Sequence, residues 1–443
     1  MVEQSVLVYS VKNSPRLKYI LNIILKDVYG LDYMITQNPV QFEQSQVPKI
    51  NYSVQRFIKE GIRIPPVSLL FEYGIKDHHI EVNNNTDYNK LFFKSNSEIP
   101  FDILAASFWL ITRYEEYLPF KQDKYNRFDV KNSLAFQYDF IQTPLVNLWL
   151  EQFKKVLLSK YPDLKFKEHK FSYLSTIDID NAYKFKFKGI MREAGGYFKS
   201  LMTRNFSEIK ERTAVLLNKK PDPFDSYKFL LELQKKHDLN VMYFFLLGDY
   251  GVNDKNHPAN NKDFQVLIKH LADYAKIGIH PSYRSNNDIN QLKVEVNRLA
   301  NITHRDIKNS RQHFAILKFP ETYQALLQTG VTADYSMGYG NYNGFRASFC
   351  IPYNWYDLDA EQETPLVIHP FCIIETTLRF TNKATEKTAM DFVKPIINEV
   401  KKYKGELITT IHNDTMGSVK EWEGWKNVYE NIVKEALDED KRI

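Results

Sequence analysis

The pattern of hydrophobic and polar positions changes near residue 170. Upstream of this point, two short apolar strands flank an amphipathic helix that begins at Ser14-Pro15 and ends at Gly30. An extended stretch interrupted by two prolines follows, and then a long apolar helix. These features predict a smaller α/β domain at residues 1–165. The expected elements are strands at 6–9 and 31–36, helices at 14–30 and 101–117, and an extended segment at 62–71.

Downstream of residue 170, apolar strands and amphipathic helices alternate regularly. Helices between the strands carry one apolar face each, as at Phe264, Leu267 and Leu271. About seven strand–helix units over about 250 residues fit a parallel α/β barrel better than an open sheet. We therefore predict a distorted parallel (β/α)7-type barrel at residues 166–443. The expected strands are 171–179, 240–247, 277–280, 310–317, 332–336, 366–371 and 407–412.

Composition and charge narrow the class of protein. The chain has 443 residues, is 43% hydrophobic and carries a net charge of +5 with both signs interleaved. This balance argues against a dedicated nucleic-acid surface and leaves room for a local basic patch. The two cysteines, Cys350 and Cys372, are too few for a disulfide framework or a Cys-rich zinc site. The N-terminus has no signal-peptide pattern, and the apolar run 103–111 is too short to span a bilayer. We expect a cytoplasmic protein without a membrane span.

Two acidic residues, Asp178 and Asp180, end the first strand of the predicted barrel. Residues two apart on a strand point to the same face, and two buried carboxylates on one face are costly unless something pairs them. A divalent metal with an activated water would do so, with one carboxylate as ligand and the other as base. The simpler alternative is a helix cap, since Asp180-Asn181 is also a good N-cap sequence.

Other polar residues fall at the ends of the predicted strands, where barrel enzymes carry their chemistry. Four of the eleven histidines are among them. One aspartate and two histidines form an open three-ligand site suited to zinc or another borderline divalent ion. A buried core or capping role is the alternative for any single histidine, but their joint placement favours a metal site. The residues are His280, Arg311, His313, Arg346 in the loop 338–346, His369 and His412.

The order of these motifs resembles the polysaccharide deacetylase superfamily (NodB homology, carbohydrate esterase family 4). The motifs are T-x-D-x-D at 176–180, G-x-H-P-S at 278–282 and a late strand ending in His412, within a resemblance that covers roughly residues 170–420. The segments SRQHF, GFRASFCIPYNWYDL, IHNDT and PFDILAASFWLITRYEEYLPF resemble a Bacteroidetes-type branch. That branch joins an uncharacterised N-terminal domain to the deacetylase barrel.

The resemblance implies a role for each matching residue. In the family's H-[ST]-x-x-H motif a second histidine follows four positions after the first, but Arg284 stands there in this chain. We take His313, at the neighbouring strand end, as the candidate replacement ligand. A carboxylate beside His412, either Asp414 or one from another loop, would keep that imidazole cationic. The implied roles are general base for Asp178, metal ligands for Asp180 and His280, orientation of the base for Arg311 or else Arg346, and general acid for His412, with His369 as the second candidate acid.

The implied function is a metal-dependent carbohydrate de-N-acetylase that uses a divalent ion, preferably Zn²⁺, on a carbohydrate substrate. One alternative is a hydrolase of the same fold that acts on a non-sugar amide. The other is an inactive barrel that binds a glycan or a partner, which the missing histidine favours and the retention of Asp178 disfavours. We also expect the N-terminal domain to pack near the rim of the active site, with an independently tethered module as the alternative.

Overall fold

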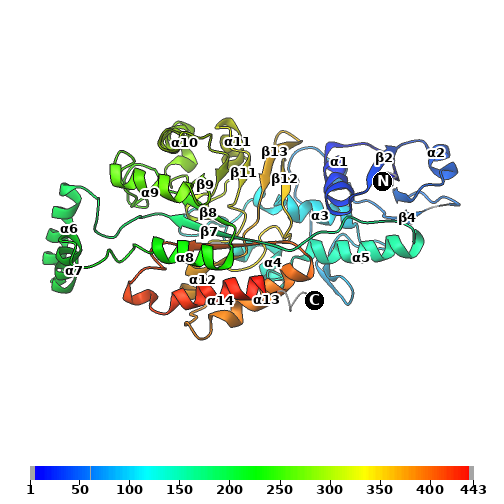
Figure 1. The fold of residues 1–443 in the computed structure, drawn as a ribbon. Coiled ribbons are helices and arrows are strands. Elements are labelled where there is room, and N and C mark those ends of the chain that lie inside the picture. Colours follow the sequence, from blue (N-terminus) through cyan, green and yellow to red (C-terminus); the bar gives the residue numbers. More distant parts are fainter. Residues whose placement is uncertain (1–4, 60, 439–443) are drawn as a thin grey trace. The chain divides into compact units, whose positions relative to one another are not determined.

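The computed structural model describes residues 5–59 and 61–438, which form two compact units (Figure 1). The first unit consists of 1–172, 344–370 and 398–406, and the second of 173–343, 371–397 and 407–443, within the described residues. The chain thus returns to the first unit twice after residue 172. The domain division at residues 165/166 and the docking of the N-terminal domain at the barrel rim stay predictions.

The first unit contains a four-stranded parallel sheet with the order β2-β1-β3-β4. The predicted helix after β1 is confirmed: Ser14 caps it by accepting from the backbone N–H of Leu17, and Pro15 occupies its first turn. A π-helical segment continues this helix to Val28. The elements are β1 (Ser5–Ser10), α1 (Pro15–Leu21), β2 (Asp32–Thr36), α2 (Pro39–Gln44), β3 (Lys49–Tyr52), β4 (Ile62–Arg63), β5 (Asn83–Asn85), β6 (Asn89–Leu91) and α5 (Leu145–Lys160).

Two other predictions in this unit were partly wrong. The helix predicted at 101–117 is shorter, because α3 (Ile103–Ile111) ends just before Arg113, which adopts the left-handed conformation with φ 57°. The strand predicted at 366–371 ends at residue 368 and pairs antiparallel with its neighbour, not parallel. The two strands of this pair are β12 (Tyr353–Asp357) and β13 (Gln362–Ile368).

The second unit is built on a largely parallel sheet with the strand order β11-β10-β9-β8-β7-β15-β14. The pairs β7–β8, β8–β9, β9–β10, β10–β11 and β14–β15 all run parallel. The predicted α/β class is therefore confirmed, while no closed barrel is seen among the strands that the structure describes. The strands are β7 (Ser172–Ile179), β8 (Val241–Phe245), β9 (Lys276–Ile279), β10 (Asn309–Ser310), β11 (Ala333–Asp334), β14 (Ile373–Ile374) and β15 (Glu406–His412).

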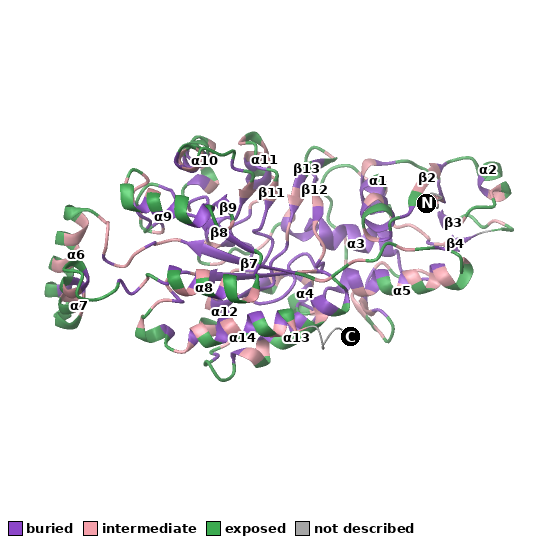
Figure 2. Ribbon diagram, in the orientation of Figure 1, coloured by how far each residue is buried: buried purple, intermediate pink, exposed green. Residues whose placement is uncertain are grey.

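Helices follow the strands of this unit, and most of them bury an apolar face, whereas the apolar residues of the helix at 190–202 are exposed. Strands β7 to β9 are buried almost throughout (Figure 2). The apolar face predicted at Phe264, Leu267 and Leu271 is confirmed, because all three side chains are buried. In the described part of the chain no helix is both long and apolar enough to cross a membrane. The helices are α6 (Ile190–Met202), α7 (Phe206–Leu216), α8 (Tyr227–His237), α9 (Lys262–Ala272), α10 (Ile289–Thr303), α11 (Glu321–Gln328), α12 (Glu375–Phe380), α13 (Ala389–Lys402) and α14 (Trp425–Leu437).

The strand predicted at 310–317 was wrong over most of its length. Only Asn309–Ser310 pairs in the sheet, and the chain then turns into a 3-10 segment at His313–Ala315. Phe314 takes a positive φ of 59° there, which a continuing strand cannot accommodate. The early turn leaves residues 311–313 beyond the carboxyl end of the sheet.

Candidate metal centre

The register of four neighbouring strands aligns their carboxyl ends. Ile179 of β7 is opposite Phe245 of β8, Phe245 is opposite Ile279 of β9, and Ile279 is opposite Ser310 of β10. The next residue in three of these strands is therefore Asp180, His280 or Arg311. Parallel strands end at one edge of a sheet, so the topology brings these polar residues together.

Close approach of β8 and β9 requires the glycine of the G-x-H-P-S segment. Gly278 lies opposite Phe244, and a Cβ at this position would come within 2.5 Å of the Phe244 ring. A larger residue would push β9 away from the sheet and move His280, two positions further along. The glycine of this motif is therefore required for packing, whereas its histidine supplies the chemistry.

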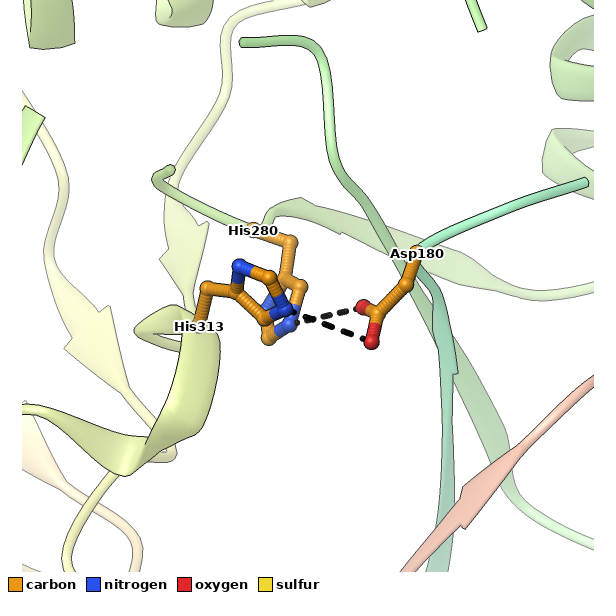
Figure 3. Close-up of side chains that lie close together, drawn as sticks. All are labelled: Asp180, His280 and His313. Atoms are coloured by element: carbon orange, nitrogen blue, oxygen red, sulfur yellow. Dashed lines mark ion pairs between the residues drawn. The ribbon is translucent and has the colours of Figure 1, made fainter. Parts of the chain in front are cut away.

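Asp180, His280 and His313 converge in the structure (Figure 3). The Nε2 atom of His280 lies 3.1 Å from Oδ1 of Asp180, and Nε2 of His313 lies 3.4 Å from Oδ2. One potential ligand atom from each residue lies within 4.8 Å of the others. Asp178 is beside them, with its Oδ2 4.0 Å from Nε2 of His280. All four residues were predicted for this site from the sequence.

The two imidazole rings are held through their other nitrogen atoms. Nδ1 of His280 lies 2.5 Å from the carbonyl oxygen of Arg311, and Nδ1 of His313 lies 3.0 Å from Oδ1 of Asp254. An Nδ1–H that donates to such an oxygen leaves the lone pair on Nε2, as in histidines that bind metals. Asp254 is a site residue that the sequence analysis missed, because no periodic pattern marks the loop in which it lies.

The polar atoms at the centre fit a divalent cation. Oδ1 of Asp180 and Nε2 of His280 are buried without a hydrogen-bond partner in the described part of the chain, although they lie 3.1 Å apart. Buried polar atoms rarely stay unsatisfied. One carboxylate and two imidazoles are also the donor set of open zinc sites. The residues therefore suit a bound ion better than a direct hydrogen bond between them.

Strong electrostatic coupling accompanies this proximity. Burial raises the pKa of Asp180, but the His313 and His280 imidazoles lower it more, so the pKa lies well below the usual range. Burial lowers the pKa of His313, but Asp180 and Asp254 raise it to about 9. The site therefore favours positive charge beside Asp180.

Arg311 lies near Asp178 without binding it directly. Its Nη1 atom is 3.7 Å from Oδ1 of Asp178, which is within ion-pair range and too long for a hydrogen bond. The same nitrogen donates to Oγ1 of Thr410. Two aromatic rings, Phe244 and Phe371, lie 5.0 and 5.1 Å from the guanidinium carbon. These contacts fix a buried cation next to the carboxylate.

Two other candidates belong to the first unit. Arg346, the alternative to Arg311, pairs with Glu116 in the first unit, with 2.8 Å between Nε and Oε1. His369, the second candidate acid, also lies in the first unit, where its Nδ1 is 2.7 Å from Oε2 of Glu406. Arg311, in contrast, lies within ion-pair distance of Asp178 in the second unit.

His412 ends β15 and faces the same centre. Its Nε2 lies 3.9 Å from Oδ2 of Asp180, and its Nδ1 lies 2.7 Å from Oε1 of Glu375. Glu375, the fully buried first residue of α12, is therefore the expected carboxylate from another loop. Burial lowers the pKa of His412, but Glu375 and Asp180 raise it well above its usual value. Burial also raises the pKa of Asp414, to about 6.

Comparisons with known proteins gave one family match and several similar solved structures. A family of unknown function, DUF7033, matches residues 6–162. A protein from Mycobacterium smegmatis assigned as a polysaccharide deacetylase is 13% identical with a TM-score of 0.40, over 62% of this chain and 87% of that one. A polysaccharide deacetylase from Bacillus cereus is 14% identical with a TM-score of 0.29, over 59% and 89%. A CE4 family pseudoenzyme from Bacillus anthracis is 10% identical with a TM-score of 0.28, over 59% and 61%. No curated protein matches the sequence.

Proposed function

We propose that this chain is a metal-dependent hydrolase that removes N-acetyl groups from a sugar or a polysaccharide precursor. The distorted barrel and membership of the polysaccharide deacetylase superfamily are part of this proposal. The observation that carries it is the convergence of Asp180, His280 and His313, whose potential ligand atoms lie within 4.8 Å of one another. The motif order seen in the sequence supports the same reaction class.

The three converging residues would hold the divalent ion, with Zn²⁺ as the first choice for one carboxylate and two imidazoles. When bound, such an ion polarises a carbonyl group and makes water more acidic. Asp254 and the carbonyl of Arg311 would fix the ring orientations of His313 and His280 through Nδ1.

Asp178 is suited to take the proton of the attacking water. Its Oδ1 atom is buried without a hydrogen-bond partner in the described part of the chain, so it can accept a new one. The Arg311 cation, with its Nη1 atom 3.7 Å from this oxygen, places a positive charge beside the carboxylate that would act as the base. A base in this position contributes typically ~10²–10⁴-fold to the rate.

His412 is suited to protonate the departing amine. Its Nδ1 is held by Glu375, so Nε2, on the side of Asp180, is the atom that can give up a proton. As the C–N bond of the amide breaks, transfer of this proton lets the nitrogen leave as a neutral amine. An amide nitrogen is a very poor leaving group without such help.

The test measures metal content and acetate release on the same purified protein. We expect one bound divalent ion per chain and release of acetate from N-acetylglucosamine oligomers or phosphorylated N-acetyl sugars. His313→Ala should lose both the ion and the activity. Bound metal together with turnover of ureides or cyclic imides only would favour the non-sugar alternative. A wild-type protein with neither metal nor turnover would contradict the proposal and favour an inactive binding barrel.

A further inference from the structure

A strongly basic insertion lies between β7 and α8. Residues 181–220 hold ten Lys and Arg against three Glu, a net charge of +7, whereas the whole chain carries +5. The remainder of the chain is therefore slightly negative. Such a concentration of positive charge in forty residues marks a local anion-binding surface.

The insertion is a helical hairpin whose two ends are tied together. Backbone N–H groups of residues 184–186 donate to the Asp222 carboxylate at 2.7, 2.8 and 3.0 Å. Within the hairpin, Arg212 of α7 pairs with Glu193 of α6 at 2.7 Å. A Cβ at Gly196 would lie 2.5 Å from the Arg212 guanidinium, so glycine permits this close packing. Figure 1 shows α6 and α7 set apart from the sheet of the same unit.

Between this hairpin and the loop at 250–255 is a pocket of about 350 Å³. Lys184 and Arg212 already have carboxylate partners. In the described part of the chain, the other four cations have no carboxylate within ion-pair distance. Burial, with Arg212 and Arg192 nearby, lowers the pKa of Lys188 to about 8. The charged residues lining the pocket are Lys184, Lys188, Arg192, Lys199, Arg212, Lys255 and Glu208.

Two residues that line the pocket are sequence neighbours of residues at the candidate metal centre. Asn181 lines it and directly follows Asp180. On its other side, Lys255 directly follows Asp254, the residue that holds His313. Part of the pocket wall is therefore formed by residues next to Asp180 and Asp254, so a ligand held there by its anionic group can extend towards the site. A cavity of this size suits a small polar group, and clustered Lys and Arg side chains without a carboxylate partner suit phosphate oxygens.

We propose that this basic pocket binds the phosphate or diphosphate of a phosphate-linked N-acetyl sugar. The proposal rests on the proposed function and specifies its substrate class. The sugar would occupy the metal centre, while the phosphate ester oxygens would contact Lys188, Arg192 and Lys199. A nucleoside diphosphate and a lipid diphosphate share this chemistry.

The test is calorimetric titration of inorganic pyrophosphate into the full chain, a measurement that needs no turnover. Lys188→Met and, separately, the exposed Lys199→Met should each weaken binding about tenfold, the effect of losing one charge-assisted contact. Lys293→Met, on the exposed face of α10, is the matched control and should have no effect. Asp180→Ala should retain pyrophosphate binding. No binding to the wild type, or loss confined to Asp180→Ala, would overturn the pocket whatever the outcome for hydrolysis.

Competition then separates the two sources of the diphosphate. UDP-N-acetylglucosamine and a short-chain prenyl diphosphate N-acetylglucosamine should each be compared with pyrophosphate on the wild type and on Lys188→Met. Tighter binding of one of them, lost in the variant, identifies that carrier. Binding of both no tighter than N-acetylglucosamine would overturn the substrate class.

A second observation concerns the outer face of the same hairpin. Met191 and Ile190 are 89% and 88% exposed, and they recur on one face of α6 with Phe198, Leu201 and Met202. Phe206 and Leu217 are exposed as well. Contiguous exposed apolar residues of this size mark an interaction surface. An amphipathic helix with apolar residues on one face and Lys and Arg beside them is the pattern of helices that lie on anionic membranes.

We therefore infer that the apolar face of α6 lies on the surface of an anionic lipid bilayer, because the +7 charge of the insertion complements anionic headgroups. The full chain should sediment with phosphatidylcholine vesicles that contain phosphatidylglycerol and should not sediment with phosphatidylcholine alone. Met191→Ser combined with Phe198→Ser should abolish sedimentation, whereas Val266→Ser, an exposed apolar residue on α9, should not. Absence of sedimentation, or a wild-type dimer that the double variant converts to a monomer, would overturn the inference in favour of a protein partner or a second copy.

Discussion

Oε1 of Glu375 lies 2.7 Å from Nδ1 of His412 and accepts two further hydrogen bonds, from the backbone N–H of His412 and from Oγ1 of Thr415, both at 2.9 Å. A buried carboxylate in this position does two things. It holds the imidazole in one orientation, and it stabilises the imidazolium form. The residue that would support the acid role proposed for His412 is thus 37 positions away in the sequence.

The first prediction concerns the role of His412 itself. His412→Ala should reduce hydrolysis of an N-acetyl sugar by ~10²–10⁴-fold, because the amine leaves poorly without a proton. An aryl acetate ester has a much better leaving group and should lose far less. Rates of both substrates with the two proteins give the comparison, and equal losses would remove His412 from the acid role. His369→Ala, in the first unit, is the control and should leave the rates on both substrates unchanged.

A related prediction concerns pH. The pKa of His412 is raised chiefly by Glu375, against the effect of burial, so the imidazole stays cationic above neutral pH. Glu375→Gln should move the alkaline limb of the kcat profile to lower pH, because the imidazole then loses its proton sooner. Metal content should stay the same. Asp414→Asn should shift the limb less, and a limb that stays in place in Glu375→Gln would show that His412 does not set it.

Variants of Asp178 and His280 should separate catalysis from metal binding. Asp178→Asn should lower turnover by ~10²–10⁴-fold and keep the metal, because it removes a base. His280→Ala should lose the metal as well, because it removes a ligand. Elemental analysis of both variants beside their rates tests this division. Equal loss of metal from both would assign Asp178 to the ligand set.

A variant of Asp254 tests whether its contact with Nδ1 of His313 strengthens metal binding. Asp254→Asn should weaken metal binding by about 10–100-fold while turnover at saturating metal is largely kept, since it alters only the partner of a ligand. Competition with a zinc indicator measures the affinity. Asp249→Asn is the control, because Asp249 is half exposed and pairs with Arg298 at 2.8 Å on the surface. The same affinity in both variants would show that Asp254 does not act through His313.

His257 should make stability depend on pH. Burial lowers its pKa to about 4, although the Lys186 carbonyl, 2.9 Å from Nε2, opposes the shift. Because the unfolded chain binds the proton more readily, up to ~3 kcal/mol of stability should be lost as the pH falls from about 6.5 towards 4. Urea unfolding at several pH values should show this slope in the wild type and a smaller one in His257→Gln. His79→Gln, on the surface, should keep the wild-type slope.

Much of the candidate metal centre could be predicted because strand periodicity is local. Asp178 and Asp180 were found from two-residue spacing at the end of one strand, and His280 from the end of another. His313 was found although its strand was predicted too long, because the turn that replaces the strand still begins at the sheet edge. Local pattern therefore located the residues better than it located the ends of the elements.

The partners of these residues could not be predicted in the same way. Glu375 and Asp254 act across 37 and 59 positions of the sequence, and no spacing rule connects such pairs. Arg346 remained an alternative to Arg311 in the sequence, and only tertiary packing pairs Arg346 with Glu116. The basic hairpin was also missed, because charges averaged over the whole chain conceal a local excess between 181 and 220.

The hydrogen bonds from residues 184–186 to the Asp222 carboxylate, here called the clasp, make the hairpin a separable module. Because the chain enters and leaves the insertion at one buried carboxylate, the 190–216 segment can change in length or sequence without moving β7 or the residues beyond it. Evolution could therefore exchange this module and retarget the same chemistry to another carrier or surface. A chimera that carries a different hairpin on the same clasp would acquire the ligand preference of that hairpin. It would keep the reaction proposed for the metal centre.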